Sequence, residues 1–133
     1  LLAAARWLQA HPRGNGKLGV VGFCYGGAIA NFLATRLPDL KAAAPFYGSA
    51  PPVDSVPAIN AELLVVLAAD DPRVNATWPD YKAALEQHGK NYTLLQPPGT
   101  VHGFHNDTTP RYDEAAAKQA WEATLALFDR TLR

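Results

Sequence analysis

Apolar residues along this chain gather in two patterns, and each pattern predicts one kind of element. Nearly continuous apolar runs bounded by turn residues are typical of strands covered on both faces of a parallel sheet. The run from Glu62 to Ala69 (ELLVVLAA) is the strongest of them. The predicted strands are residues 17–22, 40–47, 62–69 and 91–96.

Elsewhere apolar residues recur every three or four positions, which is the spacing of one helix face. Local signals mark the ends: His11-Pro12 follows the first such stretch, and Gly89 follows another. The predicted helices are residues 2–10, 26–36, 79–88 and 113–130. The expected inward-facing residues are Ile29, Phe32, Leu33 and Leu37, then Trp78, Tyr81, Leu85 and His88, and finally Ala117, Trp121, Thr124 and Phe128.

Helices and strands alternate along most of the chain, which favours an open α/β sheet. We therefore expect a mostly parallel sheet flanked by helices, in a single domain over residues 1–133. Segments 49–61 and 97–110 show neither period and are expected to be surface loops.

The amino-acid composition limits the kinds of fold, binding partner and compartment that are expected. Hydrophobic residues make up 48% of the 133 residues, so a globular fold is expected. The net charge is zero and no basic run is present, which argues against a nucleic-acid or membrane partner. No apolar stretch approaches the roughly 18 residues of a membrane span. The single cysteine cannot form an internal disulfide, which fits a reducing compartment, and we expect a cytoplasmic protein.

The most informative motif is Gly22-Phe23-Cys24-Tyr25-Gly26-Gly27, directly after the first predicted strand and before a predicted helix. Small residues two positions before and after a nucleophile are what a nucleophile elbow requires. Two other interpretations exist. Glycine-rich turns also bind phosphates, although neither GxGxxG nor GKS/GKT is present, and a lone Cys is often a small buried hydrophobe.

Two further reactive sites fall at predicted strand ends, where sites form in open α/β sheets. Asp70 and Asp71 follow the third predicted strand, and His102 lies in the loop after the last. The chain order of nucleophile, acid and histidine is that of the α/β-hydrolase triad. Considered alone, the aspartates could form a solvated turn, and His102 or His105 could simply bond to the backbone.

Each residue has a chemical reason for its place. A helix N-terminus and a nearby histidine are expected to lower the pKa of the Cys24 thiol, and His102 can then protonate a leaving group. An Asp bonded to the second imidazole nitrogen fixes its tautomer. The backbone N–H of Tyr25 is placed to donate to an oxyanion. The histidines are too few and scattered for a zinc site, so no metal is expected.

The segments GVVGFCYGG, AADDPRVN and PGTVHGFHNDTTPRYDEAAAKQAW together resemble the C-terminal portion of the dienelactone hydrolase family (carboxymethylenebutenolidases), in the α/β-hydrolase superfamily. By position, the resemblance implies Cys24 as nucleophile, Asp71 rather than Asp70 as acid, and His102 rather than His105 as base. It implies hydrolysis of a small lactone or ester through a thioester, with no cofactor.

The resemblance also implies further chain upstream, carrying sheet strands, a second oxyanion donor, a glutamate and a substrate-binding arginine. The sequence opens Leu-Leu-Ala with no Met, which fits that expectation. The elbow strand should then have an unpaired edge, open to a second copy or to a complementing N-terminal fragment. Arg111 and Asn106 in the histidine loop are possible contacts for a substrate carboxylate.

Two rival hypotheses remain at this stage. The chain could be an inactive or incomplete fragment that binds a partner through its open edge. It could also have another α/β-hydrolase activity, such as that of a peptidase or thioesterase.

Overall fold

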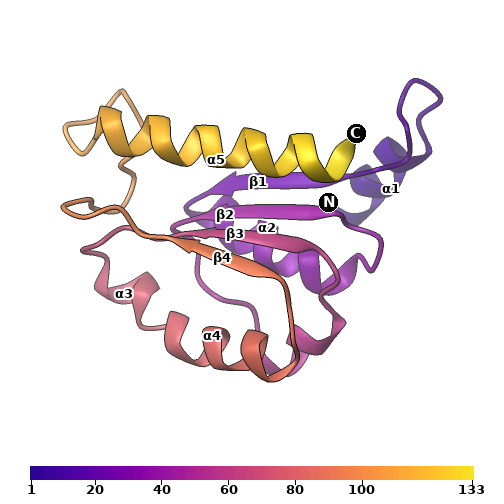
Figure 1. Cartoon of the computed structure of the whole chain (residues 1–133), viewed down its shortest axis with the longest axis horizontal. Helices are drawn as coiled ribbons and strands as arrows, with labels where there is room; N and C mark the ends of the chain where they lie inside the picture. The colour runs from indigo at the N-terminus through magenta and orange to yellow at the C-terminus, as the bar shows by residue number, and fades with distance from the viewer.

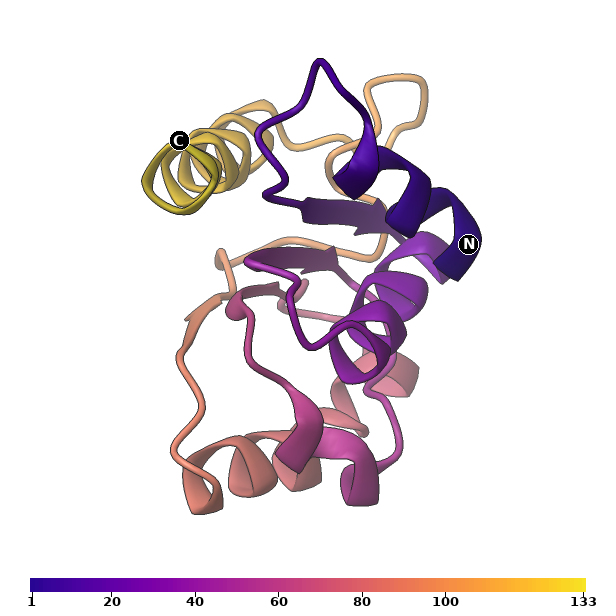
Figure 2. The ribbon, with the colours of Figure 1, turned by 90° about the vertical axis from the view of Figure 1, so that its right-hand side faces the viewer.

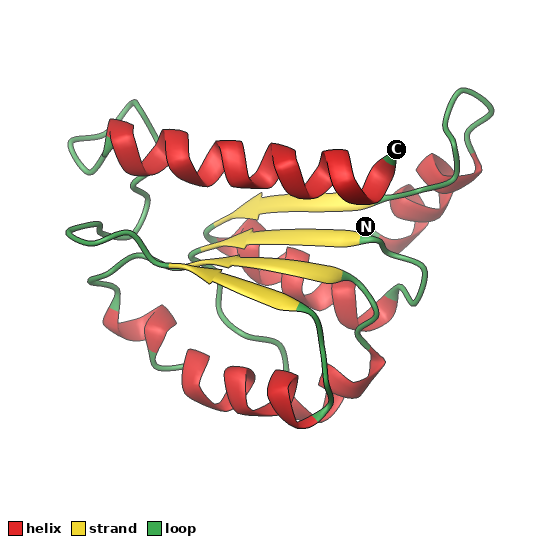
Figure 3. Ribbon diagram, in the orientation of Figure 1, coloured by secondary structure: helices red, strands yellow, loops and turns green.

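The computed structural model describes all of residues 1–133 and places four strands and their helices in alternation (Figures 1 and 3). The strands are β1 (Gly19–Phe23), β2 (Ala42–Phe46), β3 (Glu62–Val66) and β4 (Tyr92–Leu95). The helices are α1 (Leu2–Ala10), α2 (Tyr25–Arg36), the 3₁₀ helix η1 (Val53–Ala58), α3 (Pro72–Asn75), α4 (Trp78–Gln87) and α5 (Glu114–Leu132).

The sheet is entirely parallel and its strands lie in the order β1-β2-β3-β4. Phe23 pairs with Phe46, and Phe46 with Val66, so these strands end at one level. Parallel pairing brings the carboxyl ends of all four strands to one edge, where the loops that carry the candidate residues emerge.

Helices cover both faces of the sheet, with α5 on one and α1 and α2 on the other (Figure 2). Alternate strand residues supply the two cores, as the period of a strand requires. Ala43, Leu63 and Val65 face the core that includes α2, η1 and α4. Ala42, Leu64 and Val66 face the core that includes α5. The two central strands, β2 and β3, are therefore buried on both faces, which is why they are continuous apolar runs in the sequence.

The predicted elements are all present, with ends displaced by a few residues. Two short helices were not predicted: η1 forms within the predicted loop 49–61, and α3 begins at Pro72. With six and four residues, both are too short for a helical period to appear in the sequence. The prediction of an inward-facing side chain is wrong for three residues, since Phe32 and Trp121 are each 37% exposed and His88 is also exposed.

The prediction of an unpaired elbow strand is confirmed, because β1 forms one end of the sheet. All five β1 residues are half-buried, whereas all five β2 residues are buried. No helix has the length and apolar content to cross a membrane.

Candidate active site

Cys24 lies in the turn between β1 and α2, with φ 58° and ψ −120°. Positive φ is costly for a residue with a side chain and persists only where surrounding structure enforces it. Here the enforcement comes from close packing of glycines. A Cβ on Gly27 would lie 2.5 Å from the Phe46 carbonyl oxygen, and one on Gly48 would lie 2.2 Å from the Gly27 carbonyl carbon. The turn thus has the backbone geometry expected of a nucleophile elbow.

The elbow is tied to the neighbouring strand. The Cys24 N–H donates to the carbonyl oxygen of Phe46, the last residue of β2, at 3.0 Å. The next residue, Tyr47, also has positive φ (37°), and its N–H donates to the Val66 carbonyl at 2.7 Å. Cys24 and Tyr47 are therefore held side by side by the same ladder of backbone hydrogen bonds.

Asp71 and His102 are paired, with Asp71 Oδ2 2.6 Å from His102 Nδ1. The backbone brings them together, because Asp70 and Val101 form an isolated parallel bridge one residue before each. The Asp70 N–H donates to the Thr100 carbonyl at 2.9 Å. Asp71 is buried and His102 half-buried, so solvent weakens their interaction little. A proton on Nδ1 shared with the carboxylate leaves Nε2 free to accept another.

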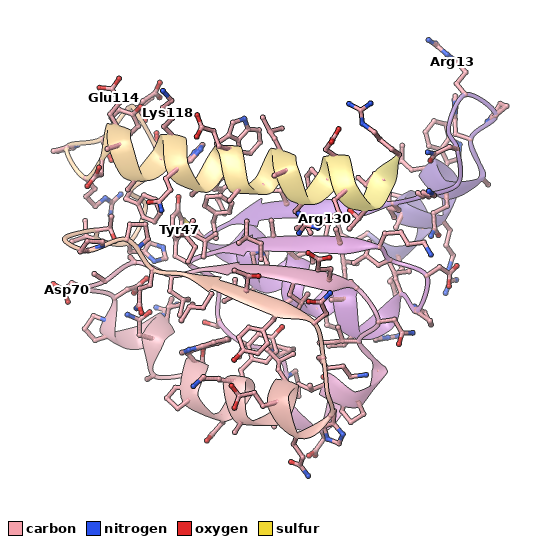
Figure 4. All side chains as sticks on the ribbon, in the orientation of Figure 1. Arg13, Tyr47, Asp70, Glu114, Lys118 and Arg130 are labelled. Carbon is pink, nitrogen blue, oxygen red and sulfur yellow. The ribbon has the colours of Figure 1, made fainter.

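The structure separates the two alternatives left by the sequence. Asp70 is exposed, and its side chain points outward at the left-hand edge of the molecule (Figure 4). His105 forms no hydrogen bond with an aspartate side chain; its ring centroid lies 5.0 Å from that of Phe23 and 5.6 Å from that of Trp121. The pKa of His105 is lowered by burial, which favours a neutral imidazole.

Two hollows open beside Cys24. The first, which we name the His102 hollow, has a volume of about 200 Å³. The second, the Arg111 hollow, has a volume of about 470 Å³. The His102 hollow is lined by Cys24, Tyr25, Ala28, Tyr47, Ser49, Arg73, Val74 and His102. The Arg111 hollow is lined by Phe23, Cys24, Tyr47, Gly103, His105, Asn106, Asp107 and Arg111.

The expectation of a thiol with a lowered pKa is wrong for this structure. Burial raises the pKa of the Cys24 thiol, and the charge of Asp71 raises it further. The positive charge of Arg111 acts in the opposite sense; its effect is smaller than that of burial and larger than that of Asp71. No hydrogen bond joins Cys24 to His102, although both line the same hollow. The raised pKa of Cys24 favours the neutral thiol over a preformed thiolate–imidazolium ion pair.

Tyr25 is the first residue of α2, and helix geometry leaves its N–H without an intrahelical acceptor. Its side chain is 81% exposed and lies at the border of the His102 hollow. An N–H free at a helix N-terminus beside Cys24 can donate to a developing oxyanion.

Sequence reasoning missed two residues at this edge. Thr100 is buried; its hydroxyl accepts the N–H of Ala69 and donates to the Pro97 carbonyl, which fixes the histidine loop to the aspartate loop. Tyr47 lines both hollows. Its position as the last residue of a predicted strand, directly before Gly48, was the available signal.

Comparison with known proteins agrees with this architecture. The sequence model of the dienelactone hydrolase family matches residues 1–132. The chain belongs to the dienelactone hydrolase family. Its fold is that of the α/β hydrolases, with a parallel sheet flanked by helices as expected from the sequence.

Individual relatives show what share of a related protein's full length this chain matches. The "Putative carboxymethylenebutenolidase" of Saccharolobus solfataricus is 36% identical over 115 residues, which are 86% of this chain and 44% of that protein. "Protein usf" of Aquifex pyrophilus is 33% identical over 121 residues, covering 87% of this chain and 52% of that one. The chain spans about half the length of the curated relatives it matches.

A solved structure shows the same relation. The dienelactone hydrolase-like promiscuous phosphotriesterase P91, from metagenomic libraries, superposes with a TM-score of 0.87 at 29% identity. The superposition covers 99% of this chain and 60% of P91.

Proposed function

We propose that this chain carries the nucleophile, base and acid of a carboxylic ester or lactone hydrolase, with Cys24, His102 and Asp71 in those roles. The observation that carries the proposal is the 2.6 Å pairing of His102 with Asp71 beside a cysteine held at positive φ. Membership of the dienelactone hydrolase family supports a small lactone or ester as the substrate.

The raised thiol pKa makes His102 a general base. When a substrate carbonyl reaches Cys24, Nε2 of His102 takes the thiol proton as sulfur attacks the carbonyl carbon. The carbonyl electrons move to oxygen, and the Tyr25 N–H stabilises that oxyanion. The C–O bond then breaks, His102 returns its proton to the leaving oxygen, and a thioester remains. Water, deprotonated by His102, hydrolyses the thioester and releases the acid.

Mass spectrometry of the chain after brief exposure to p-nitrophenyl acetate tests this proposal. An acetyl group on Cys24, lost on further incubation, is the expected result, and Cys24→Ala should remain unmodified. Failure to acetylate Cys24 would contradict the proposal and favour the inactive or incomplete fragment. Turnover of peptides without turnover of lactones would instead favour the peptidase alternative.

We further propose that the open edge of β1 is completed by a strand from additional polypeptide of the kind that makes up the other half of the relatives' length. Large apolar side chains remain exposed on the helices next to β1. They are Trp7 (64%) and Leu8 (53%) on α1, Phe32 on α2, and Trp121 and Leu125 (51%) on α5. Trp121 and Leu125 share an α5 face with Phe128 and Leu132, whose side chains reach Gly19 of β1.

An exposed apolar surface around an unpaired strand favours a partner that adds both a strand and a covering layer. The remaining length of the relatives is sufficient for such a unit, and its arrival would also cover the hollows beside Cys24. A second copy pairing through β1 is the alternative occupant, and the oligomeric state of the chain distinguishes the two.

A further inference from the structure

Cys24 and Tyr47 are the two residues that line both hollows, so together they form the divide between them. An ester bound with its carbonyl carbon at Cys24 places its acyl part and its leaving group on either side of this divide. The side chain of Tyr47 therefore lies beside the ester C–O bond that breaks.

Tyr47 is also the aromatic neighbour of His102. The two ring centroids are 4.9 Å apart and the rings are inclined by 55°. The leaving oxygen must come within hydrogen-bond reach of His102 to receive its proton. That requirement brings the leaving oxygen next to the Tyr47 ring as well.

The position of Tyr47 is well defined by its surroundings. Its side chain is 2% exposed, and its ring packs edge-on against Phe46 and Phe104. Its backbone is held at positive φ by the hydrogen bond to Val66 and by the close approach of Gly48 to Gly27. A residue held in a costly conformation at the edge of a site favours a functional role over one in packing alone.

The phenol is protonated throughout the neutral range. Burial raises the pKa of Tyr47 to about 12, and the charge on Cys24 contributes in the same direction. Tyr47 is therefore available as a hydrogen-bond donor and not as a base.

We propose that the Tyr47 hydroxyl donates a hydrogen bond to the leaving oxygen as the C–O bond of the substrate breaks. This rests on the proposed function. In this step the electrons of the breaking C–O bond pass to the leaving oxygen, His102 supplies the proton that neutralises it, and Tyr47 keeps its own proton. Tyr47 is then a catalytic residue for substrates whose leaving group is a poor one.

The test compares acylation of Cys24 in wild type and Tyr47→Phe by two acetate esters, p-nitrophenyl acetate and an alkyl acetate. Loss of one donor to developing charge costs about 10²-fold in rate, and we expect that loss with the alkyl ester. p-Nitrophenolate is a good leaving group and needs no such donor. The rate at which p-nitrophenyl acetate acylates Cys24 should therefore change less than about threefold. Tyr81→Phe is the matched control, because it removes a buried hydroxyl that donates to Asn31 and because Tyr81 lines neither hollow.

Equal losses with both esters would indicate a structural role and overturn the inference, as would an unchanged rate with the alkyl ester. If wild type is acylated and Tyr47→Phe retains the same leaving-group dependence, the inference fails and the proposed function stands. If neither ester acylates Cys24 of the wild type, both the proposed function and this inference fail.

Discussion

Gly22 lies against the backbone of Gly26, so close that a Cβ on Gly22 would be 2.0 Å from the Gly26 carbonyl oxygen. The relationship is one-sided, because a Cβ on Gly26 would meet nothing within 4 Å. The spacing that identifies the elbow in the sequence therefore contains one glycine required by sterics and one that is not. The required glycine is the one that lets α2 begin directly above the end of β1.

Substitution at these two glycines should have opposite results. Gly22→Ala is expected to destabilise the fold by several kcal/mol, because the Cβ overlaps main chain that cannot move without breaking the elbow. Gly26→Ala should leave stability unchanged or raise it by up to about 1 kcal/mol, since Ala is the better helix former. Urea unfolding followed by circular dichroism measures both. Similar unfolding midpoints for the two variants would contradict the packing described for Gly22.

The pairing of Asp71 with His102 leads to a second prediction. Asp71→Asn should reduce the rate of Cys24 acylation by about 10³–10⁴-fold, because the amide favours the wrong imidazole tautomer. Asp70→Asn is the matched control; Asp70 is exposed and should tolerate the change with little loss. The stopped-flow release of p-nitrophenolate gives both rates. A greater loss in the Asp70 variant would reverse the assignment.

The sequence predicted the strands and the longer helices because both faces of the central strands are buried and the apolar pattern is correspondingly strong. It also predicted the meeting of Asp71 with His102, since both follow strands that end at the same edge. It could not predict the environment of the thiol. The raised pKa of Cys24 depends on how deeply the elbow is buried and on the charges of Asp71 and Arg111, which only the folded chain brings near it.

Trp121 illustrates a different limit. Its position on the periodic face of α5 predicts burial, yet it is 37% exposed because the sheet ends at β1 beneath that part of the helix. Periodicity indicates which face of a helix is apolar and not whether a partner is present to cover it. Tyr47 was missed for a related reason, because a single aromatic residue after a strand has no pattern of its own.

The pH dependence of thiol alkylation tests the electrostatics at Cys24. Because the pKa of Cys24 is raised, the thiolate is scarce at neutral pH, and the rate with iodoacetamide should still be rising above pH 9. Arg111 acts to lower this pKa, so Arg111→Gln should raise it further and slow alkylation several-fold at pH 8. At pH values well above both pKa values the two rates should converge.

Arg111→Lys is the control for that experiment, since it keeps the positive charge and should behave like wild type. A rate loss in Arg111→Gln that persists unchanged at high pH would show that the arginine acts through the shape of the hollow instead of its charge. A rate for wild type that is already constant below pH 7 would contradict the raised pKa itself.

The free edge of β1 allows a prediction that rests on which way each N–H points. Leu18 and Cys24 form backbone hydrogen bonds toward β2, so by alternation the N–H of Val21 points to the open side. Val21→Pro should therefore retain the chain's own β1–β2 ladder while preventing a further strand from pairing. At the opposite edge Asn91 and Leu95 bond toward β3, so Leu94→Pro is the matched control. The measurement is sedimentation of each variant mixed with the part of P91 that this chain does not cover. Association of wild type and the Leu94 variant, but not of the Val21 variant, is expected.

Equal association of all three proteins would show that the partner binds elsewhere. If the chain instead associates with itself, and only Val21→Pro abolishes that self-association, the strand that pairs with β1 comes from a second copy.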